Sequence, residues 1–184
     1  MKTIWEDETV RIRPFREADV EPYFEAVRVS SAQVGRWLSW CHDGYTLAEA
    51  EAWVASRAAA WEKGEAYCFV LERKQDGLFL GATGLNTINP LHRFCNLFYW
   101  VRSDAAGKGY TTAGARLTAQ FGFSELGVMR IEIVTDVENR ASRRVAEKVG
   151  ALWEGVERNR LFHARRGEAM DGVMYALIPS DFGY

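Results

Sequence analysis

Hydrophobic and polar positions follow strand or helix spacing along most of the chain, and this pattern predicts a series of secondary-structure elements. Residues 10–15 alternate and predict a first strand, and a helix is expected to begin near Asp19. Thr46 and Glu49 have the spacing of a capping box, which predicts that a second helix begins there. The hydrophobic residues expected to face inward from that helix are Leu47, Ala50, Trp53, Val54, Ala58 and Trp61.

The rest of the chain predicts a hairpin, a central strand and further alternating elements. Residues 67–72 and 78–85 flank Asp76-Gly77, a typical hairpin turn. The apolar run NLFYWV, residues 96–101, indicates a strand in the centre of a sheet. The elements expected after it are a helix at 111–126, a strand at 130–135, a helix at 141–149 that Gly150 ends, and strands at 152–159 and 172–178. No linker-like stretch interrupts them, so we expect one α+β domain over residues 1–184, with antiparallel hairpins around a parallel centre.

Composition narrows the class of protein. The 184 residues are enough to bury one sizeable core, and 23 Lys+Arg against 25 Asp+Glu give a net charge of −2. That balance predicts no nucleic-acid partner. The N-terminus does not resemble a signal peptide, and no apolar run reaches the roughly 20 residues of a membrane helix, so a cytoplasmic protein without a membrane partner is expected. The three cysteines and three histidines lack ligand spacing, which predicts free thiols and no metal site.

The turn RSDAAGKGY, between the apolar strand and the next helix, carries the first candidate chemistry. Gly107 and Gly109 allow a sharp turn and a close approach of the backbone to a ligand. A helix N-terminus offers unpaired N–H groups and partial positive charge, to which Lys108, Thr111 and Thr112 can add donors. The pattern predicts a pyrophosphate site, although a GKG sequence alone is often only a tight turn. Neither a Walker A loop nor a complete dinucleotide fingerprint is present, since Thr112 stands where the fingerprint requires a third glycine.

The stretch RIEIVTDVENRASRRVAEKVGALWEGVERN, which begins at Arg130, adds a second feature. A strand leads into Asn139-x-x-Ser142 and a short basic helix, and Glu154-Gly155 follow. From Tyr99 to Arg158 the chain resembles the acyl-CoA-binding core of the GNAT N-acetyltransferase superfamily. Trp37-Leu-Ser-Trp40 is similar to the W-L-P-W segment of its RimJ/RimL branch, and the order of elements agrees over essentially the whole chain.

The resemblance implies a GNAT fold, a mixed central sheet whose parallel strands splay apart and are flanked by helices, with acetyl-CoA as co-substrate. The pantetheine arm would lie between these strands, along the backbone of Tyr99, Trp100 and Val101. Residues implied in binding the phosphates are Gly107, Lys108, Gly109, Tyr110, Thr111, Thr112, Arg143, Arg144 and Lys148. Asn139 would bond the pantetheine and Ser142 would help to protonate the departing thiolate, although either could instead be an ordinary residue of a helix N-terminus. Trp37 and Trp40 would line the acceptor site.

The identity of the acceptor depends on the general base. RimL-type enzymes have a Glu base, and the aligned position here is Leu161; the substitutes considered are Glu157, His163, Glu168, Asp171 and a chain of waters. An α-amine has a pKa of about 7.7–8.0 and a lysine about 10.4. An enzyme without a strong base is therefore expected to acetylate a protein N-terminus. The alternatives are a small-molecule amine as acceptor and a non-catalytic acyl-CoA-binding module. Dimers are frequent in the family, so a homodimer is also expected.

Overall fold

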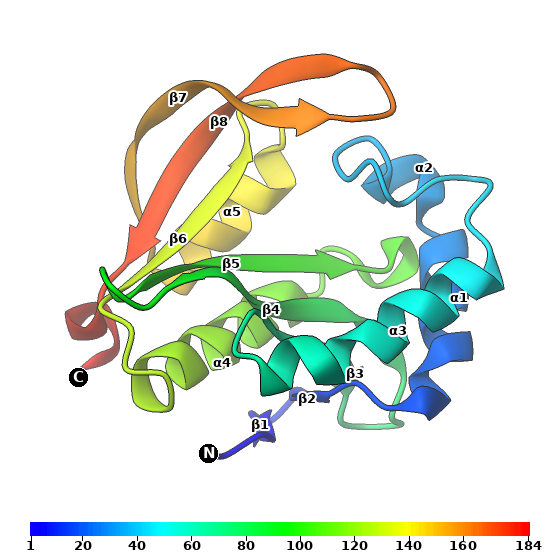
Figure 1. Cartoon of the computed structure of the whole chain (residues 1–184), viewed down its shortest axis with the longest axis horizontal. Coiled ribbons are helices and arrows are strands. Elements are labelled where there is room, and N and C mark those ends of the chain that lie inside the picture. The colour runs from blue at the N-terminus through cyan, green and yellow to red at the C-terminus, as the bar shows by residue number, and fades with distance from the viewer.

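The computed structural model describes residues 1–184 and places the predicted strands in one eight-stranded sheet, in the order β1-β2-β3-β4-β5-β6-β8-β7 (Figure 1). Seven strands follow the predicted segments, and the two-residue β1 was not predicted. The strands are β1 (Trp5–Glu6), β2 (Val10–Pro14), β3 (Tyr67–Arg73), β4 (Phe79–Asn89), β5 (Phe94–Val101), β6 (Arg130–Asp136), β7 (Leu152–His163) and β8 (Glu168–Leu177). Only β5 and β6 pair in parallel, so the predicted α+β class and mixed sheet are confirmed.

The longer helices lie close to the predicted positions, and the four-residue α2 was not predicted. The helices are α1 (Val20–Arg28), α2 (Ser31–Val34), α3 (Leu47–Glu62), α4 (Tyr110–Ser124) and α5 (Arg140–Val149), with short 3₁₀ turns at Glu17–Asp19, Ser103–Ala105 and Pro179–Phe182. The capping box of α3 is present: the Thr46 amide donates to Glu49 Oε2 at 2.8 Å, and the Glu49 amide donates to Thr46 Oγ1 at 3.3 Å. No helix of the chain has both the length and the apolar character needed to cross a membrane.

Two inward positions predicted for α3 are wrong. Leu47 is 40% exposed in the first turn, and Ala58 is exposed as well. The guanidinium of Arg57 lies 4.5 Å from the ring centroid of Trp53, so this long side chain takes the inner position that periodicity gave to Ala58. The buried residues of α3 are Ala50 and Val54.

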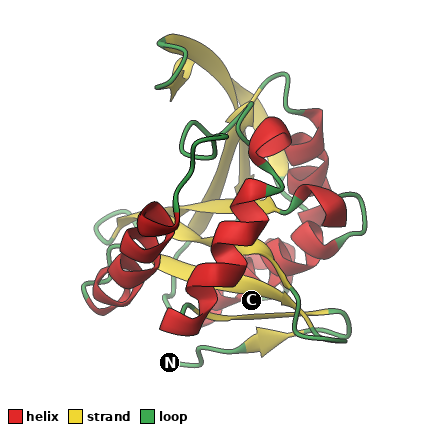
Figure 2. Ribbon diagram, turned by 90° about the vertical axis from the view of Figure 1, so that its right-hand side faces the viewer, coloured by secondary structure: helices red, strands yellow, loops and turns green.

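Helices cover both faces of the sheet (Figure 2), and each face has its own hydrophobic core. Phe69 and Leu71 of β3 belong to the larger core, beside Phe121 of α4, whereas Val70 packs into the smaller core with Tyr23 of α1. Since both faces are covered, β3 and β4 have long runs of buried residues and do not alternate.

The parallel pair β5–β6 is short. Its ladder joins residues 94–96 to residues 130–132 and goes no further, while β4 stays paired with β5 as far as Val101 and β8 stays paired with β6 as far as Asp136. Figure 1 shows the two strands diverging beyond the ladder. We call Leu97–Val101 of β5 and Ile133–Asp136 of β6 the splayed section. Alternate amides of a strand point to opposite sides, so those of Leu97–Val101 that face β6 have no strand partner.

Candidate active site

The loop after β5 has the backbone conformation that its glycines were expected to allow. Gly107 has φ 78° and Gly109 φ 86°, both left-handed, and Gly109 is the N-cap of α4. No side chain caps this helix, so its first N–H groups keep no intrahelical or side-chain partner. A Cβ at either glycine would meet no atom within 4 Å, which leaves the loop open to an approaching anion. Lys108 lies exposed between the two glycines.

The first turn of α5 is fixed by its own cap. Asn139 is the N-cap, and its Oδ1 accepts a hydrogen bond from the Ser142 amide at 3.1 Å. The ordinary capping role considered for Asn139 is therefore present, and it leaves the Nδ2 group free for a ligand. Ser142 is half-buried, and its side chain faces β5: Ser142 Oγ donates to Tyr99 Oη at 3.2 Å.

The resemblance implied a role for the backbone of Tyr99, and the structure shows that its side chain also makes hydrogen bonds at this place. Its hydroxyl donates to the Ser142 carbonyl oxygen at 2.9 Å while accepting from Ser142 Oγ, so it connects β5 to α5 next to the splayed section. The two residues are 43 positions apart, and the sequence pattern gives no signal for this contact. Trp100, its neighbour, is buried on the opposite face with Tyr23, and Val101 ends the strand.

The basic residues of α5 divide into two kinds. Arg143 is engaged by the fold, since its Nη1 donates to the Val137 carbonyl at 3.1 Å and its Nε donates to Tyr175 Oη at 3.3 Å. Arg144 and Lys148 are exposed, and their side chains make no ion pair or hydrogen bond. Arg140, at the start of the same helix, is likewise exposed without a side-chain partner, so these three residues present free positive charge.

The N-terminal segment that precedes the two tryptophans meets the late β7–β8 hairpin in the structure. His163, at the end of β7, is 4% exposed, and its Nε2 lies 3.1 Å from the Gly35 carbonyl oxygen. A carbonyl can only accept, so Nε2 carries the proton of this bond. Figure 1 shows the β7–β8 hairpin reaching over toward α2. Gly35 is required there, because a Cβ would lie 2.2 Å from the Cys41 carbonyl oxygen.

The two tryptophans predicted for the acceptor site follow Gly35 in the chain. Trp40 is 36% exposed and stacks on Tyr23 at 6.4 Å between centroids, with its edge toward Trp100 at 5.5 Å. Trp37 is half-buried and lies under the guanidinium of Arg36. Trp40 thus extends from the smaller core to the surface.

The candidate bases other than His163 each have a partner. Glu168 pairs with Arg166 at 3.1 Å, Asp171 accepts from the Asn159 amide at 2.9 Å, and Glu157 pairs with Arg160 at 2.9 Å. Of these residues, only Glu157 is in register with a residue of β6. It pairs with Gly172 of β8, and Gly172 pairs with Asp136 at the end of β6.

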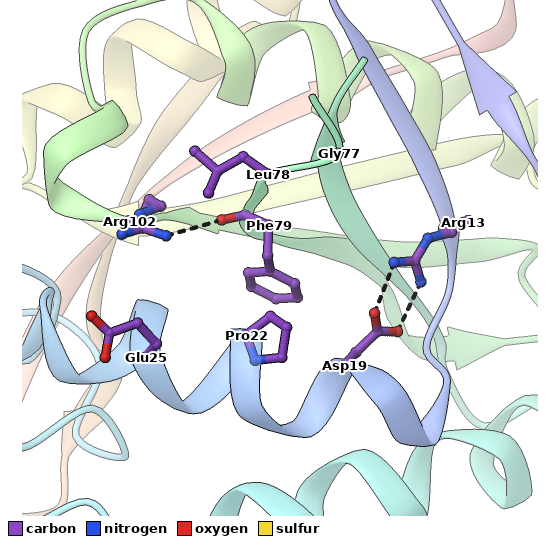
Figure 3. Close-up of a pocket in the computed structure, with 8 residues that line it drawn as sticks. All are labelled: Arg13, Asp19, Pro22, Glu25, Gly77, Leu78, Phe79 and Arg102. Atoms are coloured by element: carbon purple, nitrogen blue, oxygen red, sulfur yellow. Dashed lines mark hydrogen bonds and ion pairs between the residues drawn. The ribbon is translucent and has the colours of Figure 1, made fainter. Parts of the chain in front are cut away.

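A hollow of about 330 Å³ lies elsewhere, between α1 and the turn from β3 to β4 (Figure 3). Charged side chains that line the hollow already have partners in the fold. Arg13 forms two hydrogen bonds with Asp19, at 2.7 and 2.8 Å, and Arg102 donates to the Phe79 carbonyl. We assign no site to this hollow. No group of three or more His, Cys, Asp or Glu side chains is placed to hold a metal ion.

In this chain β5 diverges from its parallel neighbour β6 and leads into a glycine loop and a helix N-terminus. This arrangement defines a class of acyl-CoA-dependent transferase. The chain belongs to the GNAT acetyltransferase family, whose domain model matches residues 9–152, and acetyl-CoA is its acyl donor. Among curated proteins it is similar to YdaF of Bacillus subtilis, which is named as a ribosomal N-acetyltransferase, with 27% identity over 96% of this chain and 94% of that one. The spermidine N(1)-acetyltransferase of Escherichia coli strain K12 is 30% identical over 44% of this chain and 43% of its own.

Solved structures agree with the fold. Mycobacterium smegmatis RimJ, in complex with CoA-disulfide, superposes with a TM-score of 0.88 over all of this chain and 90% of its own, at 22% identity. RimL, the ribosomal L7/L12 α-N-protein acetyltransferase in complex with coenzyme A, gives 0.86 over 96% of this chain and 98% of its own, at 21% identity. The GNAT family, the mixed α+β fold and the enzyme class predicted from sequence are confirmed, and the relatives and structural neighbours include proteins named as ribosomal-protein acetyltransferases.

Proposed function

We propose that this acetyltransferase transfers the acetyl group of acetyl-CoA to the α-amine at a protein N-terminus. The observation that carries the proposal is the parting of β5 from β6 beside the Gly107–Gly109 loop, which leaves strand amides and helix N–H groups free for one extended ligand. The protein acceptor is supported by YdaF, which is named for ribosomal acetylation and aligns over nearly the whole chain, whereas the spermidine enzyme aligns over less than half.

Backbone groups would provide most of the donor site. The amides of Leu97–Val101 that face β6 would bond the pantetheine arm and polarise the thioester carbonyl, as in an oxyanion hole. The N–H groups of the loop and of the first turn of α4 would hold the pyrophosphate, because a helix N-terminus favours negative charge. Arg144 and Lys148 would face the nucleotide phosphates, while Asn139 Nδ2 would bond the pantetheine.

The transfer would be direct. A neutral amine attacks the thioester carbon, the C–N bond forms, the C–S bond breaks, and Ser142 assists the departing thiolate from the first turn of α5. An acyl-cysteine intermediate is not expected, since burial raises the pKa of Cys41 to about 11 and that of Cys95 to about 12. Both thiols therefore stay protonated and unreactive near neutral pH.

An N-terminal α-amine suits this site because it requires little help to lose its proton. At neutral pH an amine of pKa about 8 is roughly one-tenth neutral, whereas a lysine of pKa about 10.4 is less than one-thousandth neutral. The three candidate carboxylates already have partners. Glu157 pairs with Arg160 and Glu168 pairs with Arg166, while Asp171 accepts from the Asn159 amide. The acceptor's own pKa would then decide which amines react.

A small amine is the second candidate, favoured by the similarity to spermidine acetyltransferase. Thiol release from acetyl-CoA separates the two, measured with a peptide bearing a free N-terminus, with the same peptide blocked at its N-terminus but retaining a lysine, and with spermidine. We expect release with the free peptide and mass spectrometry to locate the acetyl group at its first residue. Release with spermidine alone, or with the blocked peptide, would contradict the proposal.

We also propose that two copies associate through β7. This strand is the edge of the sheet, where strands have unpaired backbone groups, and it exposes Leu152, Trp153 and Val156 by 66%, 60% and 53%. Light scattering should give the mass of a dimer, and replacing Val156 with Lys should give a monomer.

A further inference from the structure

The hydroxyl of Tyr99 makes two bonds that the transfer scheme above does not use. Tyr99 lies in the splayed section, where β6 no longer pairs with β5. Its hydroxyl donates to the Ser142 carbonyl oxygen at 2.9 Å and accepts from Ser142 Oγ at 3.2 Å. No other side-chain hydrogen bond joins β5 to α5 in this chain, so one phenol links the parted strand to the helix.

The direction of the Tyr99 side chain follows from its cross-strand neighbour. Tyr99 pairs with Thr83 of β4, and paired residues of antiparallel strands point to the same face. The Thr83 hydroxyl lies 3.0 Å from that of Thr118 in α4. Tyr99 therefore points to the face that α4 covers, where it packs against the larger core, and its hydroxyl bonds to the first turn of α5.

The ionisation of Tyr99 limits what it can do. Burial raises the pKa of the phenol above its ordinary value, and the hydrogen bond with Ser142 offsets only part of this. An ordinary tyrosine, with a pKa of about 10, already holds its proton more tightly than an ordinary cysteine thiol, with a pKa of about 8.5. Tyr99 is therefore a poor source of a proton for a thiolate, and what it can supply is the hydrogen bonds of a neutral hydroxyl.

We propose that Tyr99 is a positioning residue that holds Ser142 and the N-terminus of α5 against the splayed strand. The inference rests on the proposed function, because it requires the thioester sulphur to lie beside Ser142. In the structure the Ser142 hydroxyl is directed at Tyr99. When that hydroxyl turns toward the sulphur, the Tyr99 O–H, 3.2 Å from Ser142 Oγ, can donate to it in turn.

The proton count over one turnover requires no net change in either residue. The amine nitrogen gains its bond to the acetyl carbon and releases one proton, and the sulphur loses its bond to that carbon and takes up one proton. Ser142 and Tyr99 return to the neutral forms in which they began. Tyr99 thus positions Ser142 for the departure of the thiolate, and the proton that the sulphur takes up is matched by the one that the amine releases.

The test is a double-mutant cycle with Tyr99→Phe and Ser142→Ala, which removes each hydroxyl in turn. We expect Y99F to lower kcat about tenfold, which is less than the roughly 10²–10⁴-fold typical of a group that itself transfers the proton, with the acetyl-CoA KM changed less than about threefold. The double variant should be no slower than the slower single variant, because the two hydroxyls act as one unit.

Tyr175→Phe is the matched control. The Tyr175 hydroxyl also binds α5, through Arg143 Nε at 3.3 Å and Glu147 Oε1 at 3.1 Å, but does not contact Ser142. Y175F should keep the wild-type kcat. Wild-type kcat in Y99F, multiplying effects in the double variant, or an equal loss in Y175F would overturn the inference while the wild type stays active. A wild type that transfers no acetyl group to any amine would contradict the proposed function itself, and this inference with it.

Discussion

The donor and acceptor sides of the opening between β5 and β6 are built differently. The proposed donor side, which comprises Leu97–Val101, Gly107–Gly109 and the first turns of α4 and α5, would bind through backbone groups whose positions follow from local sequence. The proposed acceptor side comprises Gly35–Trp40 and the β7–β8 hairpin, which are joined by the bond from His163 to Gly35 across 128 residues. A backbone site tolerates many side-chain changes, whereas a site made of distant side chains can change its acceptor by few substitutions.

The largest effect is expected from breaking the donor loop. Gly109→Val forces a β-branched residue into a left-handed conformation, φ 86°, at a cost of about 1–3 kcal/mol, and places a side chain where the phosphates would bind. Calorimetry should show the acetyl-CoA Kd rising about 10- to 100-fold. Gly77→Val is the control, since Gly77 has φ 73° in the distant β3–β4 turn. The Gly77→Val variant should destabilise the fold comparably and leave the acetyl-CoA Kd unchanged. An unchanged Kd in folded G109V would mean that the phosphates bind elsewhere.

Ser142→Ala tests the chemical step of the donor side. The variant should lower kcat about tenfold or more, because the hydroxyl assists the thiolate only as charge develops on the sulphur. The acetyl-CoA KM should hardly change, since the hydroxyl is not required for binding. Steady-state kinetics with the best acceptor measure both constants. A wild-type kcat would mean that water assists the thiolate and that Ser142 is structural.

The acceptor side should fail differently. His163→Ala removes one buried hydrogen bond, worth about 0.5–1.5 kcal/mol, and frees the hairpin from the Gly35 carbonyl. The acceptor KM should rise about three- to tenfold, while the acetyl-CoA Kd measured by calorimetry stays at the wild-type value. His92→Ala, in the exposed turn between β4 and β5, controls for the loss of an imidazole. A loss of acetyl-CoA affinity in H163A would show that the two sides are not independent.

The pH profile sharpens the comparison without a large effect at any one pH. The neutral amine attacks, so log kcat/KM should rise by one per pH unit and level off near the pKa of the acceptor, about 8 for an α-amine. Ionisation of Tyr99 should add no further slope to the pH profile, because burial keeps its pKa above the pH range of the assay. A plateau that begins near pH 6–7 would instead reveal an enzyme base, with Glu157 and His163 the first to replace.

The same division explains how far the sequence could be interpreted. Gly107 and Gly109, the capping box of α3 and the apolar run of β5 report local backbone conformation, and the structure has them as predicted. The bonds from Tyr99 to Ser142 and from His163 to Gly35 join residues 43 and 128 positions apart, which periodicity cannot detect. The end of β7 was missed because it is an edge strand, exposed along most of its length, without hydrophobic alternation. The contribution of individual side chains to the site remains a proposal.

Hydrogen exchange in the presence and absence of acetyl-CoA tests most directly whether the parted strand and the glycine loop hold the donor. Protection should increase in peptides covering Leu97–Val101, where the amides that face β6 have no strand partner, in Gly107–Thr112, and in the first turn of α5. The β7–β8 hairpin around His163 should exchange at the same rate with and without the ligand. Protection confined to the hairpin or to the hollow beside α1, with the splayed section unchanged, would contradict the assignment of the donor site.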